Sequence, residues 1–438
     1  MTFPKKYKRM LFRIFLGSML LFFLIILGLL APGLWNRWVF YPKLDKIRDS
    51  LVDSHQEAKP IIPLKDYKGV LHSHSYWSHD SRGLLIEILP AAKQAELDFI
   101  FLSDHKRSKL DTFPRGYHGM YEGVLIESGT ESNGMMVNPL DSVVLDWSQS
   151  TDTLIHKIVN RGGMALYVHS EEDHDWANPD YQGMEIYNIH TDLKDESGLL
   201  PFLLNSLVTG KRYKHWGYRE LYDDQEKIWT LWDSLNQHRR VVGFAAVDAH
   251  NNQSIRARYL EDGRVEWVGS NAKTISIVEP GWKESLLLGK PDTAGWAWKW
   301  ELDTYFHSFN YVNTHILADS LSSTNLRDHL LAGHTFIAFE SLANASGFQF
   351  FTWDEDHQVN AILGDSIPYQ EVSQIKAISP IPVRFELIKD GELIDAKEYD
   401  YEYTFEPNDQ KGNYRLAAKL NFGEKQVLWI MTNPLYLY

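Results

Sequence analysis

Short apolar runs that end in histidine, aspartate or glutamate recur along the middle of this chain of 438 residues. Brief apolar runs separated by helical segments are typical of buried parallel strands in βα units. We predict strands at 69–71, 99–103, 124–127, 164–168, 184–187 and 241–247, with helices at 90–96, 151–161 and 219–238. The alternation predicts an α/β fold built on a parallel sheet or barrel.

The residues at the ends of these strands are of types that bind metal ions. His72 and His74 are two residues apart, so on a regular strand both side chains point to the same side. The following strands end in Ser-Asp-His105, Gly-Thr-Glu131, His169, His190 and an Asp-x-His formed by Asp248 and His250. The carboxyl ends of parallel barrel strands meet at one face, so we expect these residues to be neighbours.

The chain has no cysteine, so a transition metal must be held by imidazole and carboxylate groups. Its formal net charge of -14 argues against binding nucleic acid through a general basic surface. A small molecule is therefore the expected partner, and a stable nucleic-acid partner is not expected.

The order of the motifs resembles the PHP family, named for polymerase and histidinol phosphatase. The resemblance covers about residues 67–280. The ending Trp429-Ile-Met-Thr-Asn-Pro-Leu-Tyr436 is similar to that of the larger, carbaryl-hydrolase-like branch, whose members carry an added β domain. The resemblance implies a distorted (β/α)7 barrel that encloses two or three divalent ions, usually manganese, zinc or iron.

By this resemblance nine residues bind the metals, namely His72, His74, Asp80, His105, Glu131, His169, His190, Asp248 and His250. The first ion would take His72, His74 and Asp248 with Glu131 as a bridge, and the second would take His105 and His169 with Glu131. Asp80, His190 and His250 would serve a third ion. An amidohydrolase barrel also begins with His-x-His, but usually bridges its metals with a modified lysine, so the carboxylate of Glu131 favours the PHP interpretation.

The chemistry that such ions support is hydrolysis, with Glu131 at the metals and His190 or His250 as the proton donor. A phosphate-specific site usually adds cations that are not metal ligands. Lys106 and Arg107 follow His105, while Arg256 and Arg258 follow His250, so we expect both pairs on loops at the mouth of the site. We assign catalytic roles to Lys106 and Arg256, and interpret His79 as part of the loop surface.

The N-terminus contains 21 uncharged residues, 14–34, enough to cross a hydrocarbon core of ~30 Å as a helix. Five cations precede this run and Trp35, Trp38 and Tyr41 follow it, as at a membrane interface. The run is longer than the apolar core of most signal peptides, so we favour an uncleaved single-pass anchor over a cleaved signal. We expect the catalytic part on the periplasmic or extracellular side of a bacterial-type membrane.

The tail after about residue 348 reads as successive antiparallel strands, with a hairpin turn at Asp390-Gly391. The predicted domains are an anchor at 1–35, a stalk at 36–66 with a helical patch at 44–52, a metal-dependent hydrolase domain at 67–340 and a β-sandwich at 341–438. The leading prediction is a membrane-anchored phosphoesterase that acts on a mono- or diester of a small molecule or nucleotide. The alternatives are a carboxyl-ester or carbamate hydrolase with the same metals, and a non-catalytic envelope binding protein.

Overall fold

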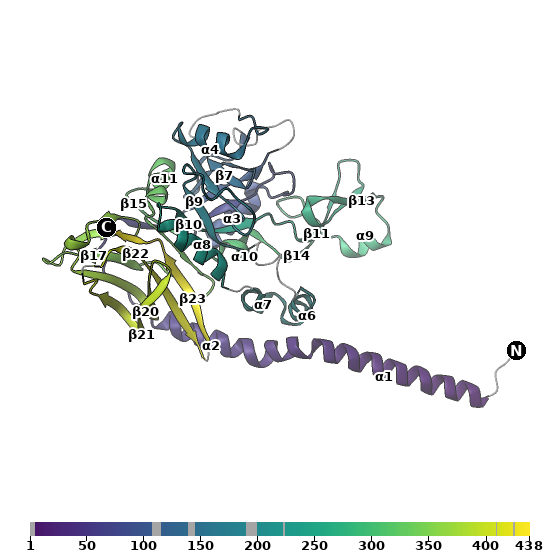
Figure 1. The fold of residues 1–438 in the computed structure, drawn as a ribbon. Coiled ribbons are helices and arrows are strands. Elements are labelled where there is room, and N and C mark those ends of the chain that lie inside the picture. Colours follow the sequence, from purple (N-terminus) through teal and green to yellow (C-terminus); the bar gives the residue numbers. More distant parts are fainter. Residues whose placement is uncertain are drawn as a thin grey trace. The chain divides into compact units, whose positions relative to one another are not determined.

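The computed structural model describes residues 5–106, 115–138, 145–189, 199–221, 224–408, 410–423 and 425–438 (Figure 1). Contacts along the chain define two compact units. One consists of Met1–Ser50 with Asp192–Asp223, and the other of Leu51–Thr191 with Asp224–Tyr438. The segment predicted as a stalk, 36–66, is thus divided between the two units.

The first unit is helical. Its elements are α1 (Lys5–Trp35), a π-helical turn (Asn36–Phe40), the start of α2 (Tyr41–Asp53), α6 (Leu199–Thr209), a 3-10 turn (Gly210–Tyr213) and α7 (Lys214–Leu221). α6 packs against α1 at Gly33, where an added Cβ would lie 3.1 Å from Cβ of Val208. The hydroxyl of Tyr41 donates to Glu220 at 2.9 Å and accepts from Asn205 at 2.7 Å, so polar contacts tie α2 to α6 and α7.

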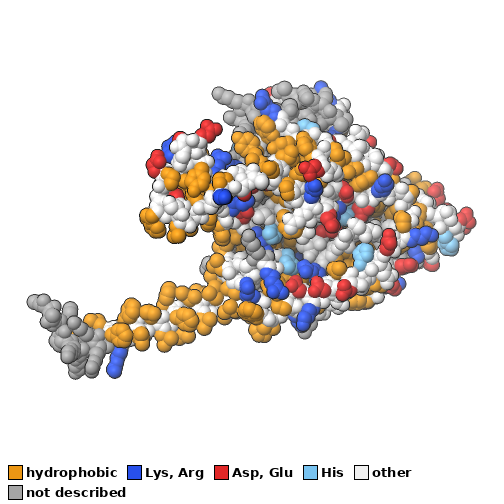
Figure 2. Space-filling view, turned by 180° about the vertical axis from the view of Figure 1, so that it is seen from behind, with side chains coloured by type: hydrophobic (Ala, Val, Ile, Leu, Met, Phe, Trp, Pro, Cys, Tyr) orange, Lys and Arg blue, Asp and Glu red, His pale blue; other side chains and the backbone are white. Residues whose placement is uncertain are grey.

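The apolar side chains of α1 are exposed along its length, with Leu21 60% and Phe22 65% accessible (Figure 2). Within the described residues, one helical stretch, Met10–Asp53, is long and apolar enough to cross a membrane. Exposing a continuous apolar surface to water is unfavourable, and by length and composition this helix is a candidate membrane span.

The second unit is built on short strands, and those at 65–73, 99–102, 124–127, 164–167, 183–188 and 242–249 overlap the six predicted apolar runs. The strands are β1 (Lys65–Ser73), β2 (Phe99–Leu102), β3 (Asp104–His105), β4 (Gly119–Tyr121), β5 (Val124–Glu127), β6 (Thr130–Ser132), β7 (Met135–Asn138), β8 (Met164–Tyr167), β9 (Gly183–Asn188) and β10 (Val242–Ala249). Parallel pairings join β5 to β2, β2 to β1, β1 to β10, β10 to β9, β9 to β8 and β6 to β3. β7 pairs antiparallel with both β6 and β8. In the chain, β3 continues β2 and β6 continues β5. The series of paired strands β2, β1, β10, β9, β8, β7, β6 and β3 therefore closes on itself.

Helices alternate with these strands as predicted. They are α3 (Leu85–Gln94), α4 (Thr151–Val159), α8 (Glu226–Asn236), α10 (Tyr305–Phe309) and α11 (Ser323–Ala332). The core includes Leu71, Phe101, Leu166 and Phe244, all fully buried side chains from β1, β2, β8 and β10. Apolar burial on this scale is the main favourable contribution to folding.

A separate four-stranded antiparallel sheet occupies residues 254–301, where the sequence predicted no strands. Its order is β13 (Thr274–Val278), β12 (Val265–Val268), β11 (Ser254–Tyr259) and β14 (Trp298–Glu301), and α9 (Trp282–Leu287) lies between β13 and β14 in the chain. Arg256 and Arg258 lie on β11, so their predicted placement on a loop is wrong. Both arginines instead point from the same face of a small sheet, since they are two residues apart.

The C-terminal strands are antiparallel except for one pair. β15 (Asn313–Ala318) pairs with β1, and β16 (Thr335–Ala338) joins β15 to the tail through β23. The tail contains β17 (Gln349–Trp353), β18 (Val359–Ile362), β19 (Ser366–Ile367), β20 (Gln374–Lys389), β21 (Glu392–Phe405), β22 (Gly412–Phe422), β23 (Lys425–Thr432) and β24 (Leu435–Leu437), and only β19 and β24 pair in parallel. The predicted hairpin turn is confirmed, because Asp390 and Gly391 connect β20 to β21 with φ of 52° and 91°, as a tight hairpin requires.

Candidate metal centre

β1 leads into the His-x-His pair, with His72 on the strand and His74 directly after its end. His72 has a left-handed backbone with φ of 59°, and the pairing of β1 with both neighbouring strands shifts between Leu71 and Ser73. An irregularity of this kind re-aims side chains that would otherwise share a face. His72 and His74 therefore belong to two different groups of ligand atoms.

The first ligand group contains one residue each from four strand ends, namely His72, Glu131, His169 and Asp248. Its ligand atoms all lie within 4.8 Å of one another. Nε2 of His72 is 2.8 Å from Oε2 of Glu131 and 3.2 Å from Oδ1 of Asp248. Nε2 of His169 is 3.4 Å from Oε1 of Glu131, so the group has the two imidazoles and two carboxylates that suit a divalent metal.

The second ligand group contains His74, Asp80, His105 and His250, again with ligand atoms within 4.8 Å of one another. Asp80 is central to it, because its Oδ2 lies 3.1 Å from Nε2 of His250 and 3.5 Å from Nε2 of His105. The rings of His74 and His250 stack with centroids 3.8 Å apart. Three imidazoles and one carboxylate form a second candidate site for a divalent ion.

The two groups share carboxylates. Oε2 of Glu131 lies 3.3 Å from His74 and 3.6 Å from His105, both in the second group. Oδ1 of Asp248 lies 3.1 Å from Nε2 of His74. Two ions held by these groups would therefore be neighbours with Glu131 between them, the arrangement of a two-metal site.

The charges of these residues support one another. Burial alone would raise the pKa of Glu131, but His72 and hydrogen bonds with His169, His72 and His74 hold it well below its usual range. Burial alone would lower the pKa of His74, but its bonds to Asp248 and Glu131 outweigh burial and raise that pKa to about 9. A histidine must be neutral to bind a metal, so metal binding at these groups would release the protons that the imidazoles hold.

The backbone of the first group is unusual. His72, His169 and Asp248 have φ of 59°, 52° and 42°, in the left-handed region that non-glycine residues rarely adopt. None of the four residues of the second group has a positive φ. Unfavourable backbone conformations cluster at functional sites, where the surrounding structure imposes them.

Glu185 is a residue that the sequence analysis missed. It is buried on β9, and its Oε1 lies 2.5 Å from Nδ1 of His72, on the ring edge opposite Glu131. Its Oε2 accepts from the backbone N–H of His169 at 2.7 Å. A carboxylate behind a histidine fixes the tautomer and orientation of a metal ligand. The available signal was a lone acidic residue inside the apolar run of β9.

The loop after β1 is fixed by Asp104. This buried carboxylate accepts from the backbone N–H of Ser75 at 2.5 Å and from its hydroxyl at 2.7 Å. The hydroxyl of Ser78 donates to Asp80 at 2.6 Å and accepts from the backbone N–H of His105. The position of Asp80 in the second group is therefore set by a hydrogen-bonded loop.

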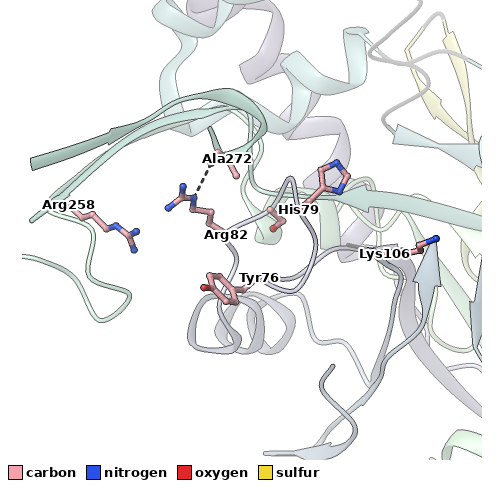
Figure 3. A pocket seen from close by; sticks show the side chains of 7 residues that line it. Tyr76, His79, Arg82, Lys106, Arg258 and Ala272 are labelled. Atoms are coloured by element: carbon pink, nitrogen blue, oxygen red, sulfur yellow. Dashed lines mark hydrogen bonds between the residues drawn. The ribbon is translucent and has the colours of Figure 1, made fainter. Parts of the chain in front are cut away.

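A cavity of about 710 Å³ opens beside the second group (Figure 3). We call it the basic pocket, and the residues that line it are Tyr76, His79, Ser81, Arg82, Lys106, Arg258 and Ala272. None of the eight candidate ligands lines it, but Ser81 and Lys106 do, and these are the chain neighbours of Asp80 and His105. The His79 ring also lies 5.1 Å from that of His105. His79 is exposed, in agreement with its interpretation as loop surface, and it also lines this cavity.

The structure brings together eight of the nine predicted ligands in two groups of four. The ninth, His190, lies outside the described residues, as does Arg107. By distance between ligand atoms, His74 falls in one group with His105, and His169 in one group with His72. Nε2 of His74 nevertheless lies beside Oε2 of Glu131 and Oδ1 of Asp248, the same atoms that Nε2 of His72 contacts, so the predicted partition among ions stays a prediction.

Lys106 lines the basic pocket, as its assignment at the mouth anticipated, but Arg256 does not. Arg256 is 2% exposed, and its guanidinium lies 2.8 Å from Glu301, 3.6 Å from Glu87 and above the ring of Trp296. A guanidinium that is buried and paired with carboxylates holds together the elements that carry those carboxylates. Arg256 therefore attaches β11 to β14 and α3.

No protein-family model matches the sequence, and no curated protein matches it. Among solved structures, the chain is similar to a two-domain protein from Bacteroides vulgatus ATCC 8482 described as containing a predicted PHP-like metal-dependent phosphoesterase. The identity is 11% and the TM-score 0.36, with 86% of this chain and 98% of that chain covered. At that TM-score the similarity carries no argument, and the function is argued from the site itself.

Proposed function

We propose that this chain is a metal-dependent phosphoesterase of the PHP type. The observation that carries the proposal is the pair of adjoining ligand groups with Glu131 between them. A purely structural metal site is closed by four ligands, whereas eight converging ligands that adjoin a large cavity are typical of a two-metal hydrolase. We further propose that the ring of pairings from β1 to β10 forms a distorted barrel around these groups.

Manganese, zinc or iron at such a centre supplies Lewis acidity and an activated water at neutral pH. The residues of the chain hold the ligands in position and transfer the proton. Glu185 and Asp104 hold the ligands and their loop in place, while the ionised Glu131 keeps the two groups close together. His250, whose Nε2 lies 3.1 Å from Asp80 in the second group, is one proposed donor of a proton to the leaving oxygen. We retain His190 as the other proposed proton donor and ligand.

The basic pocket supports a phosphoester over a carboxyl ester or carbamate. Arg82, Lys106 and Arg258 line it, and none of its seven lining residues is acidic. A neutral ester gains nothing from three cations, whereas a phosphoester carries the matching charge. The proposed substrate is therefore an anionic small molecule, such as a phosphate mono- or diester.

The apolar surface of α1 supports membrane anchoring through the N-terminal helix. With the cations at 5–13 on the cytoplasmic side, the catalytic part would lie in the periplasm or outside the cell. The phosphoester would then be one that occurs in the cell envelope.

The test uses the full chain purified in detergent without chelator. Metals per chain are measured by elemental analysis, and turnover is assayed with p-nitrophenyl phosphate, bis-p-nitrophenyl phosphate and p-nitrophenyl acetate. Glu131→Gln keeps the side-chain shape and removes the bridging charge. Glu122→Gln, an exposed residue paired with Lys93, is the matched control.

We expect at least two metals per chain and phosphate ester turnover that Glu131→Gln abolishes and Glu122→Gln retains. Turnover of the acetate alone would overturn the phosphoesterase in favour of the carboxyl-ester reading. Absence of both metal and turnover would leave a binding protein.

A further inference from the structure

Two of the three cations of the basic pocket belong to one ion-pair network that does not touch the ligand groups. Arg258 contacts Oε2 of Glu266 through Nε at 2.8 Å and through a terminal nitrogen at 2.7 Å. Arg82 reaches Oε1 of the same carboxylate at 3.5 Å. One buried glutamate therefore holds two guanidiniums side by side.

The network presents its cations toward the cavity and keeps its anion behind them. The side chain of Glu266 is 7% exposed, whereas that of Arg258 is 37% and that of Arg82 is 25% exposed. Figure 3 shows the two guanidinium groups facing the same space, across the pocket from His79 and Lys106. Two positive groups held by one negative group leave a net positive charge at this end of the pocket.

The arginines are also held in place by the backbone of the small sheet. Nε of Arg82 donates to the carbonyl oxygen of Ala272 at 3.0 Å, and Arg82 also donates to Thr274 at 3.3 Å. Thr274 in turn donates to Glu266. Guanidinium groups fixed in this way lose little entropy when they bind a planar or tetrahedral oxyanion.

The opposite end of the pocket adjoins the metal centre. Lys106, which Figure 3 shows across the pocket from the two arginines, directly follows the candidate ligand His105, so a phosphoester bound for hydrolysis would lie at this end. The cavity of about 710 Å³ is within the range of pockets that enclose a whole small molecule, ~300–1,000 Å³, and is far larger than one phosphate requires.

We propose that Arg82 and Arg258 form a subsite for a second oxyanion, phosphate or carboxylate, on the leaving-group side of the substrate. This inference rests on the proposed function and narrows its substrate class to small molecules with two anionic groups. The phosphate to be hydrolysed lies at the metal end, and the second oxyanion binds the two arginines provided by the small sheet and the loop after β1.

The experiment compares three substrates of equal chain length with the metal-loaded full chain in detergent. Butyl phosphate has no second anion, 4-phosphooxybutyrate has a carboxylate and 1,4-butanediol bisphosphate has a second phosphate. Release of inorganic phosphate gives kcat and KM for each. The variant is Arg258→Gln, and the control is Arg264→Gln, which removes an exposed arginine paired with Asp262 at the turn between β11 and β12.

We expect the unaltered chain to prefer one or both dianionic substrates over butyl phosphate by about tenfold or more in kcat/KM, mainly through KM. Arg258→Gln should remove most of that preference, with a smaller loss on butyl phosphate than on the two dianionic substrates, and Arg264→Gln should behave as the unaltered chain. The relative rates with carboxylate and phosphate identify which oxyanion is preferred. Equal loss on all three substrates, or no preference in the unaltered chain, would overturn the subsite.

A binding measurement separates this subsite from the proposed chemistry. Titration calorimetry with 1,4-butanebisphosphonate, which cannot be hydrolysed, should give binding that Arg258→Gln weakens about tenfold and Arg264→Gln leaves unchanged. If no substrate is turned over but this binding is retained, the phosphoesterase fails and the subsite stands. If butyl phosphate is hydrolysed but the bisphosphonate binding does not depend on Arg258, the subsite fails and the phosphoesterase stands.

Discussion

Glu185 lies 2.5 Å from Nδ1 of His72, so this imidazole is held between two carboxylates, Glu185 on one edge and Glu131 on the other. The ring can therefore offer only one nitrogen, Nε2, to the first ligand group. The orientation of a ligand at the centre of the site is thus decided by a residue that itself binds nothing.

We predict that Glu185→Gln lowers metal affinity about 10- to 100-fold without removing a ligand, because the amide holds the ring less firmly and makes it less basic. Competition with a metal-sensitive dye measures the affinity. Glu340→Gln is the matched control, since Glu340 is also a buried glutamate beside a histidine, His315, but is outside both ligand groups. Equal loss of affinity in both variants would contradict a specific role for Glu185.

A second prediction concerns the partition of the ions. His105→Asn and His74→Asn should each lower the metal content by one ion and leave the first ligand group loaded, because both residues belong to the second group. Elemental analysis after gel filtration gives the stoichiometry. If the two variants lose different ions, as distinguished by cobalt absorption spectra, the partition inferred from the family pattern is correct and the observed grouping is not.

The opposite end of β1 carries a buried charge cluster that should make stability depend on pH. Burial alone would lower the pKa of His315, but Asp66 and Glu340 outweigh it and raise that pKa to about 9. Because the folded pKa exceeds the unfolded value of about 6.5, the contribution is fully present below pH ~6.5 and is lost as pH rises through about 9.

We expect His315→Gln to lower the free energy of unfolding at pH 6.5 by an amount on the order of 3 kcal/mol, and by much less at pH 10. Urea unfolding of the metal-loaded chain at both pH values measures the difference between variant and unaltered protein. A loss that is the same at both pH values would show that His315 contributes through packing, for example on Phe336, rather than through its charge.

The anchor prediction concerns α1. Lysines in place of Leu21 and Leu24, both more than half exposed, should each cost about 2.5–3.5 kcal/mol within a bilayer and release the chain from membranes. Resistance to extraction by alkaline carbonate is the measurement. Val52→Lys, on the polar helix α2, is the control and should stay in the membrane fraction. Retention of the double variant would exclude a spanning role for this stretch.

Much of the fold could be predicted from local pattern. The runs of β5 and β8 are short, apolar and clearly bounded, so period and composition located them to within a residue. The small sheet at 254–301 could not be found in this way, because β11 and β12 mix arginine and glutamate with apolar residues and satisfy those charges only in three dimensions. The missed sheet is also why Arg256 was assigned to a loop and Arg258 was not recognised as the pocket cation.

The sequence could identify which residues belong to the candidate metal site, but not which of their ligand atoms lie together in the structure. Residue type and strand-end position identified His72 and His74, but a two-residue spacing carries no information about the left-handed backbone at His72 or about the further neighbours that each imidazole gains. Glu185 was missed for a related reason. Glu185 reaches His72 because β9 lies next to β10 in the sheet, and the order of strands in a sheet cannot be read from the local sequence.

The backbone at His72, His169 and Asp248 has a consequence for how this sequence can change over evolutionary time. Each of these positions costs about 1–3 kcal/mol that glycine would largely avoid. Selection for stability alone would therefore replace all three, and selection for turnover alone would retain them. A library of variants can be sorted once for thermal resistance and once for hydrolysis. The two sorts should select different residues at these three positions. They should select the same residues at His74 and His105, whose backbones carry no such cost.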